Sequence, residues 1–214
     1  MGHLVLARHA STDASQVGRN LGQRGDPPLS AHGLELADRL GVAVANELGV
    51  LSTTELRLIT SPALRCMQTA AGISDHLGGA PSAEVAAGLI EINYGDWEGL
   101  TPEECAQRDP AARAAWEADP FATATPGGES GADVTARAFP VFESIEGWLS
   151  AEPARAAIVV AHNHVNRLWL TDQMGWPMTD YRRRVAQDPA GYSLVSFAAG
   201  PPLVRRINAV PLLR

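Results

Sequence analysis

The sequence predicts an α/β fold, a three-layer sandwich in which a mostly parallel central sheet is flanked by helices. Three short runs rich in apolar and β-branched residues, at 4–7, 56–60 and 158–161, have the length of buried strands. A loop and a helical pattern follow each run. This order of strand, loop and helix is typical of parallel sheets.

The first helix is predicted to begin after Ser30, whose hydroxyl can cap free backbone N–H groups. Apolar residues then recur at every fourth position from Leu36 to Leu48, which places them on one helix face. The stretch that precedes Ser30, residues 18–28, is polar and rich in glycine and proline. It is therefore expected to be a loop.

Ser61 and Pro62 follow the second strand and have the order of an N-cap and a first helical residue. A second helix is therefore predicted to begin at Ser61 and to run towards Leu77. Arg65 would then lie in its first turns, beside the positive end of the helix dipole.

The middle of the chain contains two further helix starts. Thr101 and Glu104 have the spacing of a capping box. Ser130, after a turn-rich segment, can cap a long helical pattern that ends near Leu149. Pro140 lies inside that pattern and predicts a kink or a break.

The last third of the chain predicts a helix from the third strand to Met174 and a short helical segment at 180–185. Two β-like runs follow, at 192–197 and 204–208. We expect residues 1–214 to form a single domain, with residues 100–150 as a helical, cap-like insertion over the functional site.

Size and composition favour one soluble domain. The chain has 214 residues, of which 45% are hydrophobic and 19% charged, enough to bury a sizeable core. No apolar run is long enough to span a bilayer, and the run at 4–7 is too short for the centre of a signal peptide. We therefore expect a cytoplasmic protein.

Charge and cysteine content exclude several classes of protein. The formal net charge of −7 argues against nucleic acid and membranes as partners. All 17 residues counted as Lys+Arg are arginine, which excludes Walker-type phosphate binding and Schiff-base chemistry. The two cysteines, Cys66 and Cys105, are too few for a disulfide framework, and we expect both to be small buried residues in helices.

Basic and nucleophilic residues stand at the ends of the predicted strands. Arg8 and His9 end the first strand, Arg65 follows the second, and His162 ends the third. Open α/β sheets bind ligands at the carboxyl ends of their strands, so these residues are expected to meet there. They fit phosphoryl transfer, in which His9 attacks and the other three hold the phosphate oxygens.

Phosphoryl transfer to a nucleophile also requires a proton for the leaving oxygen. Glu91 is the candidate, because it ends an apolar stretch where partial desolvation would raise its pKa. Asp96 and Glu98 are nearby alternatives. The His162-Asn163-His164 string could suggest a metal site, but no second ligand cluster accompanies it and no metal is predicted.

Together these residues resemble the histidine phosphatase superfamily, which includes the cofactor-dependent phosphoglycerate mutases. The resemblance implies a phosphoglycerate mutase-like fold, a phosphohistidine intermediate on His9, and Glu91 as the acid and then the base that activates water. It implies no metal and no cofactor. The matching segments are Arg8-His9, 26–30 with Gly33, 61–70, 91–99, 126–130 and His162.

The chain departs from the family pattern at two positions where glycine is usual, Ala10 and Asn163. At a site with φ above zero, Ala10 would cost on the order of 1 kcal/mol and bring a methyl group close to the phosphate. Ser15 stands where mutases of the family tend to have asparagine. Thr12, Ser15, Asn163 and Glu129 are the predicted substrate contacts, although Glu129 fits equally a role at the helix that Ser130 caps.

The leading hypothesis is a metal-independent phosphomonoesterase that hydrolyses a small phosphorylated metabolite. A phosphoglycerate mutase and a non-hydrolysing phosphate-ligand binding protein are the alternatives, and a homodimer is considered. His164 is expected in the pocket wall or in a structural role. The arginines at 182–184 are expected on a solvated face, with the alternative that one of them reaches the pocket for a second acidic group of the substrate.

Overall fold

The computed structural model describes residues 1–78 and 82–211. Within this part of the chain one six-stranded sheet has the order β3-β2-β4-β1-β5-β6. The strands are β1 (Gly2–Arg8), β2 (Glu55–Thr60), β3 (Glu84–Val85), β4 (Arg155–Ala161), β5 (Tyr192–Phe197) and β6 (Leu203–Ala209). β1 to β4 are mutually parallel where they pair, and β5 and β6 run antiparallel, so the mostly parallel sheet is confirmed.

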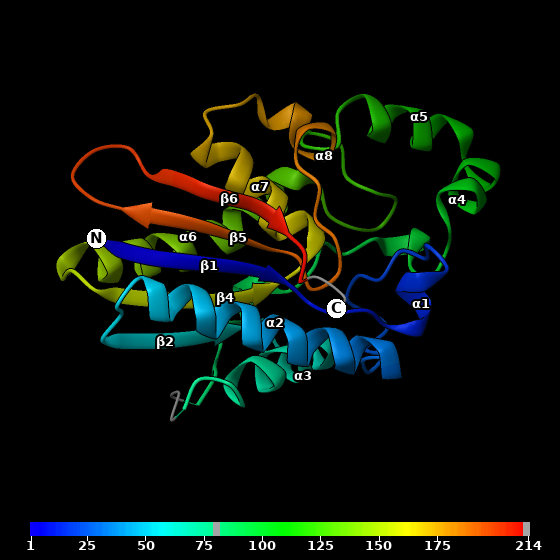
Figure 1. Cartoon of the computed structure of the whole chain (residues 1–214). Coiled ribbons are helices and arrows are strands. Elements are labelled where there is room, and N and C mark those ends of the chain that lie inside the picture. Colours follow the sequence, from blue (N-terminus) through cyan, green and yellow to red (C-terminus); the bar gives the residue numbers. More distant parts are fainter. Residues whose placement is uncertain (79–81, 212–214) are drawn as a thin grey trace.

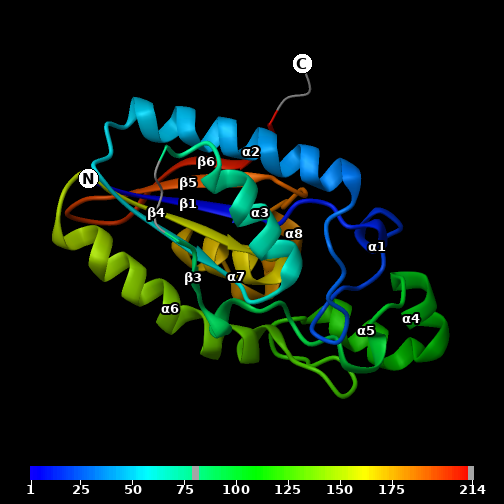
Figure 2. The same cartoon turned by 90° about the horizontal axis from the view of Figure 1, so that it is seen from below.

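Helices cover both faces of this sheet, which makes the predicted three layers (Figure 1). Figure 2 shows α2 and α3 over one face and α6 over the other. The α-helices are α1 (Asp13–Gln16), α2 (Ala31–Val50), α3 (Leu64–Ser74), α4 (Pro102–Arg108), α5 (Pro110–Ala118), α6 (Gly131–Ala151), α7 (Asn163–Gln173) and α8 (Tyr181–Arg184). Short 3₁₀ helices are η1 (Ala87–Leu89), η2 (Gly95–Trp97) and η3 (Met178–Asp180).

The core is divided between the two faces of the sheet. Alternate residues of β1 point to opposite faces, so Val5 packs with the apolar face of α2 while Leu4 packs with α6 and α7. The spacing of four from Leu36 to Leu48 is buried as predicted, against this sheet face. None of the helices in the described ranges is both long and apolar enough to cross a membrane.

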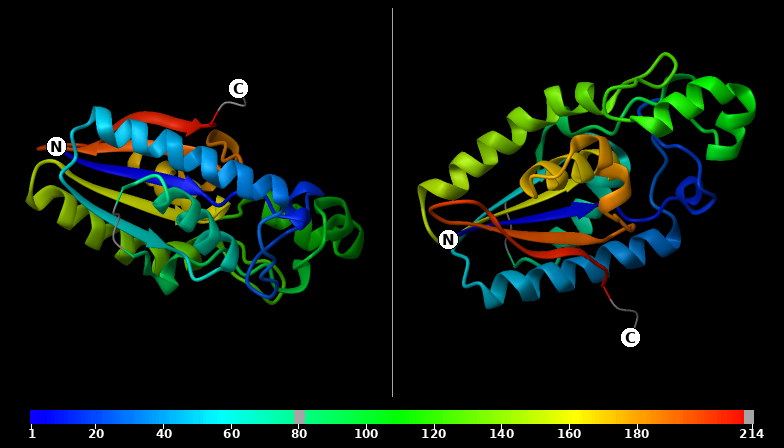
Figure 3. Two further views of the ribbon diagram at one scale, coloured as in Figure 1. Left: turned by 60° about the horizontal axis from the view of Figure 1, so that its bottom comes forward. Right: turned by 90° about the horizontal axis from the view of Figure 1, so that it is seen from above.

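Strand register brings the predicted site residues to one edge. Arg8 pairs with Ala161 between β1 and β4, so the residues that follow, His9 and His162, leave neighbouring strands at the same level. Thr60 pairs with Val160 between β2 and β4. The carboxyl ends of all three strands therefore open towards the same group of loops, where α1, α4 and α5 also lie (Figure 3).

The helix predicted to begin at Ser61 begins later, at Leu64, and ends at Ser74. Ala63 occupies the N-cap position and makes no side-chain cap. The Asp26 carboxylate instead accepts hydrogen bonds from the Leu64 backbone N–H at 2.8 and 3.0 Å. The cap comes from a loop 38 residues away, which helix propensity cannot reveal.

The break predicted at Pro140 does not occur, because α6 continues through it from Gly131 to Ala151. Pro140 and Ala136, whose carbonyl loses its helical partner, are both exposed. Water can therefore satisfy the free carbonyl, and burial of the opposite face against the sheet holds the helix together.

Candidate active site

A pocket of about 200 Å³ opens at the carboxyl ends of β1 and β4. Nearly all of its lining is polar. The lining residues are Arg8, His9, Ser15, Gly18, Arg19, Asn20, Leu21, Glu91, Tyr94, Asn163, His164 and Arg182. Three of the five predicted catalytic residues, Arg8, His9 and Glu91, are thus brought together in one wall.

The hydrogen bonds of His9 fix the tautomer of its ring. Nδ1 lies 2.8 Å from the carbonyl of Ala10, which can only accept, so Nδ1 donates and a neutral ring carries its lone pair on Nε2. Burial lowers the pKa of His9 well below 6.5, and the charges of Arg8 and Arg65 lower it further. His9 is therefore a neutral imidazole with Nε2 available as a nucleophile.

The burial of Glu91 favours its protonated form. Its side chain is 4% exposed, and burial raises its pKa, as the sequence predicted. The carboxyl group still accepts from the backbone N–H groups of Ile92 at 2.9 Å and His164 at 3.3 Å, which oppose that shift. These two bonds fix the orientation of the carboxyl group in the pocket wall.

Arg65 and His162 lie beside His9 but do not line the pocket. The rings of His9 and His162 are 5.2 Å apart, edge to face. Arg65, 1% exposed, donates through Nη2 to the Gly22 carbonyl at 3.0 Å and to His162 Nδ1 at 3.3 Å. Since Nδ1 accepts, Nε2–H of the neutral His162 ring donates to Ser61 Oγ at 2.7 Å.

Ser61 therefore orients a site histidine instead of capping a helix. Arg65 is in turn held by Asp26, with 3.6 Å between Nη1 and Oδ1. One carboxylate thus caps α3 and pairs with the arginine of its first turn. Burial lowers the pKa of His162 well below 6.5, so this ring is neutral as well.

Ala10 and Asn163 have ordinary backbone conformations. Neither has a positive φ. The strain considered for Ala10 at a site with φ above zero is therefore absent. Ala10 is fully buried in the core beneath α2 and α3, and its N–H donates to Thr69 Oγ1 at 3.0 Å. Its methyl group therefore points into the core. Asn163 is the first residue of α7 and lines the pocket.

Two other predicted substrate contacts, Thr12 and Ser15, form a capping box at the start of α1. Ser15 lines the pocket, whereas Thr12 is fully buried and does not. Their hydroxyls bond to each other's backbone N–H groups at 3.1 and 2.9 Å. Thr12 therefore supports the pocket wall from behind.

Glu129 does not reach the pocket lining. It forms two hydrogen bonds of 2.9 Å with Arg137 of α6 and accepts from the Asn93 backbone N–H at 2.8 Å. Arg137 also donates to the carbonyl of Glu91 at 3.0 Å. Glu129 and Arg137 together fix the loop that carries Glu91. The sequence had suggested instead that Glu129 contacts the substrate or serves the start of the helix that Ser130 caps.

Several lining residues were not predicted from the sequence. Tyr94 lies three residues after Glu91, and its hydroxyl is 2.6 Å from His164 Nε2. Arg19, Asn20 and Leu21 come from the loop after α1 and carry no sequence signal. Of the arginines at 182–184, Arg182 reaches the pocket and lines it.

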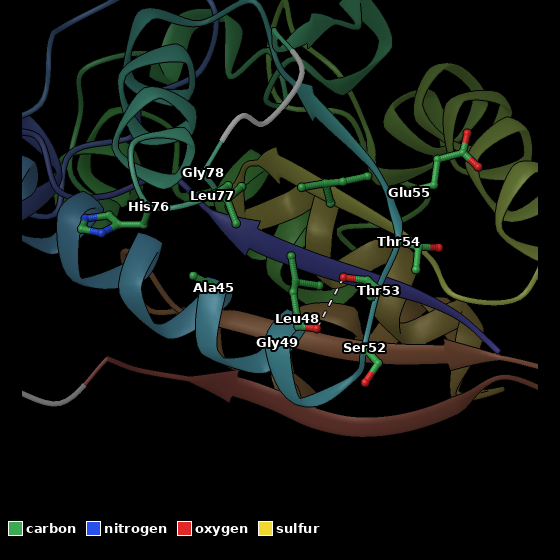
Figure 4. Close-up of a pocket in the computed structure, with 11 residues that line it drawn as sticks. Ala45, Leu48, Gly49, Ser52, Thr53, Thr54, Glu55, His76, Leu77 and Gly78 are labelled. Carbon is green, nitrogen blue, oxygen red and sulfur yellow. Dashed lines mark hydrogen bonds between the residues drawn. The ribbon is translucent and has the colours of Figure 1, made fainter.

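A pocket of about 520 Å³ lies elsewhere, between the ends of α2 and α3 and the start of β2 (Figure 4). Thr53 there donates to the Leu48 carbonyl at 3.4 Å, and His76 is bound to Asp38 at 2.7 Å. These polar groups are already paired, and the amino end of β2 is far from the strand ends that carry His9. This pocket is therefore not assigned as the active site.

The described ranges also contain no cluster of metal ligands. No group of three or more histidine, cysteine, aspartate or glutamate side chains is placed there to hold a metal ion. Cys66 and Cys105 are both buried and unbridged, as expected, and burial raises the pKa of each thiol. The polar groups around His9 are instead arranged for an anion.

The family model of the histidine phosphatase superfamily (branch 1) matches residues 4–210. The chain belongs to the histidine phosphatase superfamily. This histidine phosphatase is 31% identical to the glucosyl-3-phosphoglycerate phosphatase of Mycolicibacterium vanbaalenii over 182 residues, which cover 83% of this chain and 76% of the relative. The enzyme of that name from Mycobacterium tuberculosis is 35% identical over 165 residues, 74% and 69% of the two chains.

Solved structures agree with this placement. A mycobacterial glucosyl-3-phosphoglycerate phosphatase in complex with VO3 superposes with a TM-score of 0.78 at 29% identity, covering 97% of this chain and 98% of that one. Bacillus stearothermophilus YhfR gives a TM-score of 0.80 at 25% identity and covers 96% of both chains. The family and the fold class are confirmed, and the glucosyl-3-phosphoglycerate phosphatases among these relatives agree with the phosphatase predicted for this chain.

Proposed function

We propose that this protein is a metal-independent phosphomonoesterase that hydrolyses a small phosphorylated metabolite through a phosphohistidine on His9. The observation that carries the proposal is the state of His9, a neutral ring whose Nδ1–H is bound to the Ala10 carbonyl and whose Nε2 is free. This nucleophile lines one pocket with a cation, Arg8, and an acid, Glu91.

In the first half of the reaction, His9 Nε2 attacks phosphorus in line with the ester oxygen. The N–P bond forms as the P–O bond to the alcohol breaks, and Glu91 donates its proton to the leaving oxygen. Arg8 and Arg65 neutralise the phosphate oxygens. His162 lies behind the pocket with both ring nitrogens engaged, by Arg65 and by Ser61, and helps to hold Arg65 beside His9.

In the second half, water attacks the phosphohistidine. The Glu91 carboxylate, now ionised, removes a proton from the water, and the N–P bond breaks as the new P–O bond forms. Inorganic phosphate leaves and His9 returns to its neutral tautomer. Arg137 and Glu129 keep the Glu91 loop in place through both halves.

The substrate is proposed to be a small phosphate ester of the kind named for the relatives, and glucosyl-3-phosphoglycerate is the first candidate to assay. Asn163 supports this, because its side-chain oxygen is buried and has no hydrogen-bond partner among the described residues. A substrate hydroxyl could donate to it. α4 and α5 are proposed to form the outer wall of this site, the part of the predicted cap that is not packed on the sheet.

The experiment that tests the proposal is hydrolysis of p-nitrophenyl phosphate without added metal, before and after treatment with a chelator. Wild-type protein should turn over in both cases, and His9→Ala should reduce turnover to background, because the attacking atom is removed. Full activity of His9→Ala, or activity that needs a metal, would contradict it.

The two alternatives give different results in the same assays. A phosphoglycerate mutase would interconvert phosphoglycerates in the presence of bisphosphoglycerate, and a binding protein would bind vanadate without hydrolysing any ester. Ala10 and Asn163 motivated the binding-protein alternative. Ala10 is buried in the core and neither residue has a positive φ, which removes that motive.

A further inference from the structure

The active-site pocket contains more positive charge than a phosphate group requires. We propose that Arg182 is a specificity-determining residue that binds a second anionic group of the substrate, a carboxylate, so that the protein favours phosphate esters that also carry a carboxylate. This inference rests on the proposed phosphatase function, because it concerns the same pocket.

Arg182 is the member of its arginine triplet that lines the pocket. Arg183 is exposed and donates to the Glu117 carbonyl at 2.9 Å. Arg184 is exposed and pairs with Asp180 at 2.8 Å. The three neighbours therefore differ in what their guanidinium groups can reach, and Arg183 is a matched control for Arg182.

The positive charge near Arg182 is incompletely balanced. Its carboxylate partner, Glu117, lies 2.9 Å away and also pairs with Arg113. Arg167 lies behind it, with Nη1 3.5 Å from the Arg182 carbonyl, and forms no ion pair within the described part of the chain. Glu91 is the acidic residue of the pocket lining, and its burial favours the neutral form over the charged one.

Buried hydrogen-bond donors without partners also indicate that an anion is missing beside these arginines. The Nε–H groups of Arg8, Arg167 and Arg182 are buried, and none has a partner among the described residues. Burying such a donor without a partner is destabilising, because its hydrogen bond to water is lost and not replaced. A cluster of partly desolvated guanidinium groups is therefore stabilised by an anion beside it.

Arg182 is held ready for a ligand before the ligand arrives. Its guanidinium carbon lies 4.1 Å from the centre of the Trp116 ring, and Nη1 is bound to Glu117. Both partners belong to α5, so the outer wall of the site fixes the direction of this arginine. Little side-chain entropy remains to be lost on binding.

The second anion is inferred to be a carboxylate. Arg8 and Arg65 are assigned to the phosphate group, and Arg113, Arg167 and Arg182, which share one glutamate, leave a further positive charge that a second anion can reduce. A carboxylate accepts two parallel hydrogen bonds from a guanidinium. The pocket of about 200 Å³ also favours this smaller anion over a second phosphate.

The test compares two esters that differ only at this group, 3-phosphoglycerate and glycerol 3-phosphate, in which CH2OH replaces the carboxylate. Wild-type protein should have the higher kcat/KM for 3-phosphoglycerate. Arg182→Met should reduce this preference about tenfold or more, mainly through KM, because the lost interaction is made with a non-reacting group. Arg183→Met should keep the wild-type preference.

Equal kcat/KM for the two esters in the wild type, or an unchanged preference in Arg182→Met, would overturn the inference. If Arg182→Met does not fold, Arg182→Lys is used instead. Lysine keeps the positive charge but not the paired N–H donors of a guanidinium, so the preference for 3-phosphoglycerate should fall, by less than in Arg182→Met. If the wild type hydrolyses neither these esters nor p-nitrophenyl phosphate, the proposed function fails. Calorimetric titration with the same two esters then decides the carboxylate preference separately.

Discussion

At the scale of single residues, burial shifts the two reacting groups in opposite directions. The pKa of His9 falls because a buried imidazole resists a positive charge, and the pKa of Glu91 rises because a buried carboxyl group resists a negative one. Burial therefore favours the neutral form of both groups. This is the pair of states that attack and proton donation require.

A bell-shaped pH profile follows for an alkyl phosphate. Activity should fall towards acid only below pH 6.5, where His9 gains a proton, since its pKa is lowered from that value. It should fall towards alkali as Glu91 loses its proton, at a pKa raised above 4.5. The profile of kcat/KM for glycerol 3-phosphate measures both limbs.

Glu91→Gln should remove the alkaline limb and lower kcat/KM for the alkyl phosphate by about 10² to 10⁴, the usual contribution of a general acid. kcat/KM reports the steps up to phosphohistidine formation, so the later role of Glu91 as a base does not enter the comparison. p-Nitrophenyl phosphate should be affected less, because its leaving group needs no proton. Glu103→Gln, at an exposed carboxylate, is the control. Equal losses on the two substrates would show that Glu91 is not the acid in the first step.

The predictable part of the site was the part fixed by strand order. His9 and His162 could be placed together because parallel strands end at one edge. The direction of Ala10 could not, because it depends on which side of the strand end faces α2. The sequence could not show which arginine of 182–184 reaches the pocket. Their directions depend on the groups of α5 that they contact, such as the Glu117 carboxylate for Arg182 and the Glu117 carbonyl for Arg183.

At the scale of secondary structure, α3 depends on a cap from outside its own sequence. Asp26 accepts from the Leu64 backbone N–H and pairs with Arg65. Asp26→Ala should lower the free energy of unfolding by about 1 kcal/mol, the usual value of an N-cap, as measured by urea denaturation. Asp26→Asn should lose less, because the amide oxygen can still accept from Leu64.

Asp172→Ala is the matched control, because this aspartate is exposed and its hydrogen bond is with its neighbour Gln173. A loss at Asp172 equal to that at Asp26 would mean that the cap adds nothing. The cap also explains why the helix start was misplaced. Ser61-Pro62 fits a local start signal, but Ser61 is engaged by His162 and the next usable cap comes from the loop at Asp26.

Long elements were more predictable than short ones. α2 and α6 follow from apolar spacing and from Ser30 and Ser130, which cap them as predicted. β3 has two residues and α1 has four, so their patterns are too short to read. Their positions are determined by pairing with β2 and by the loop beside the pocket.

At the scale of the whole molecule, the site requires segments that are far apart in the sequence. β1 leads into His9, β4 leads into His162, the loop after η1 supplies Glu91 and α8 supplies Arg182. The sheet brings these groups together, and α5 holds the last of them. The homodimer and the cytoplasmic location remain predictions from the sequence.

The central claim is that His9 carries the phosphoryl group. The most direct measurement is to stop the reaction by denaturing the enzyme while it turns over substrate. The phosphate that remains covalently bound is then mapped on the denatured chain. Acid-labile, alkali-stable phosphate is expected on His9 and is expected to be absent from His9→Ala. Acid-stable phosphate, or phosphate on any other residue while His9 stays unmodified during turnover, would contradict it.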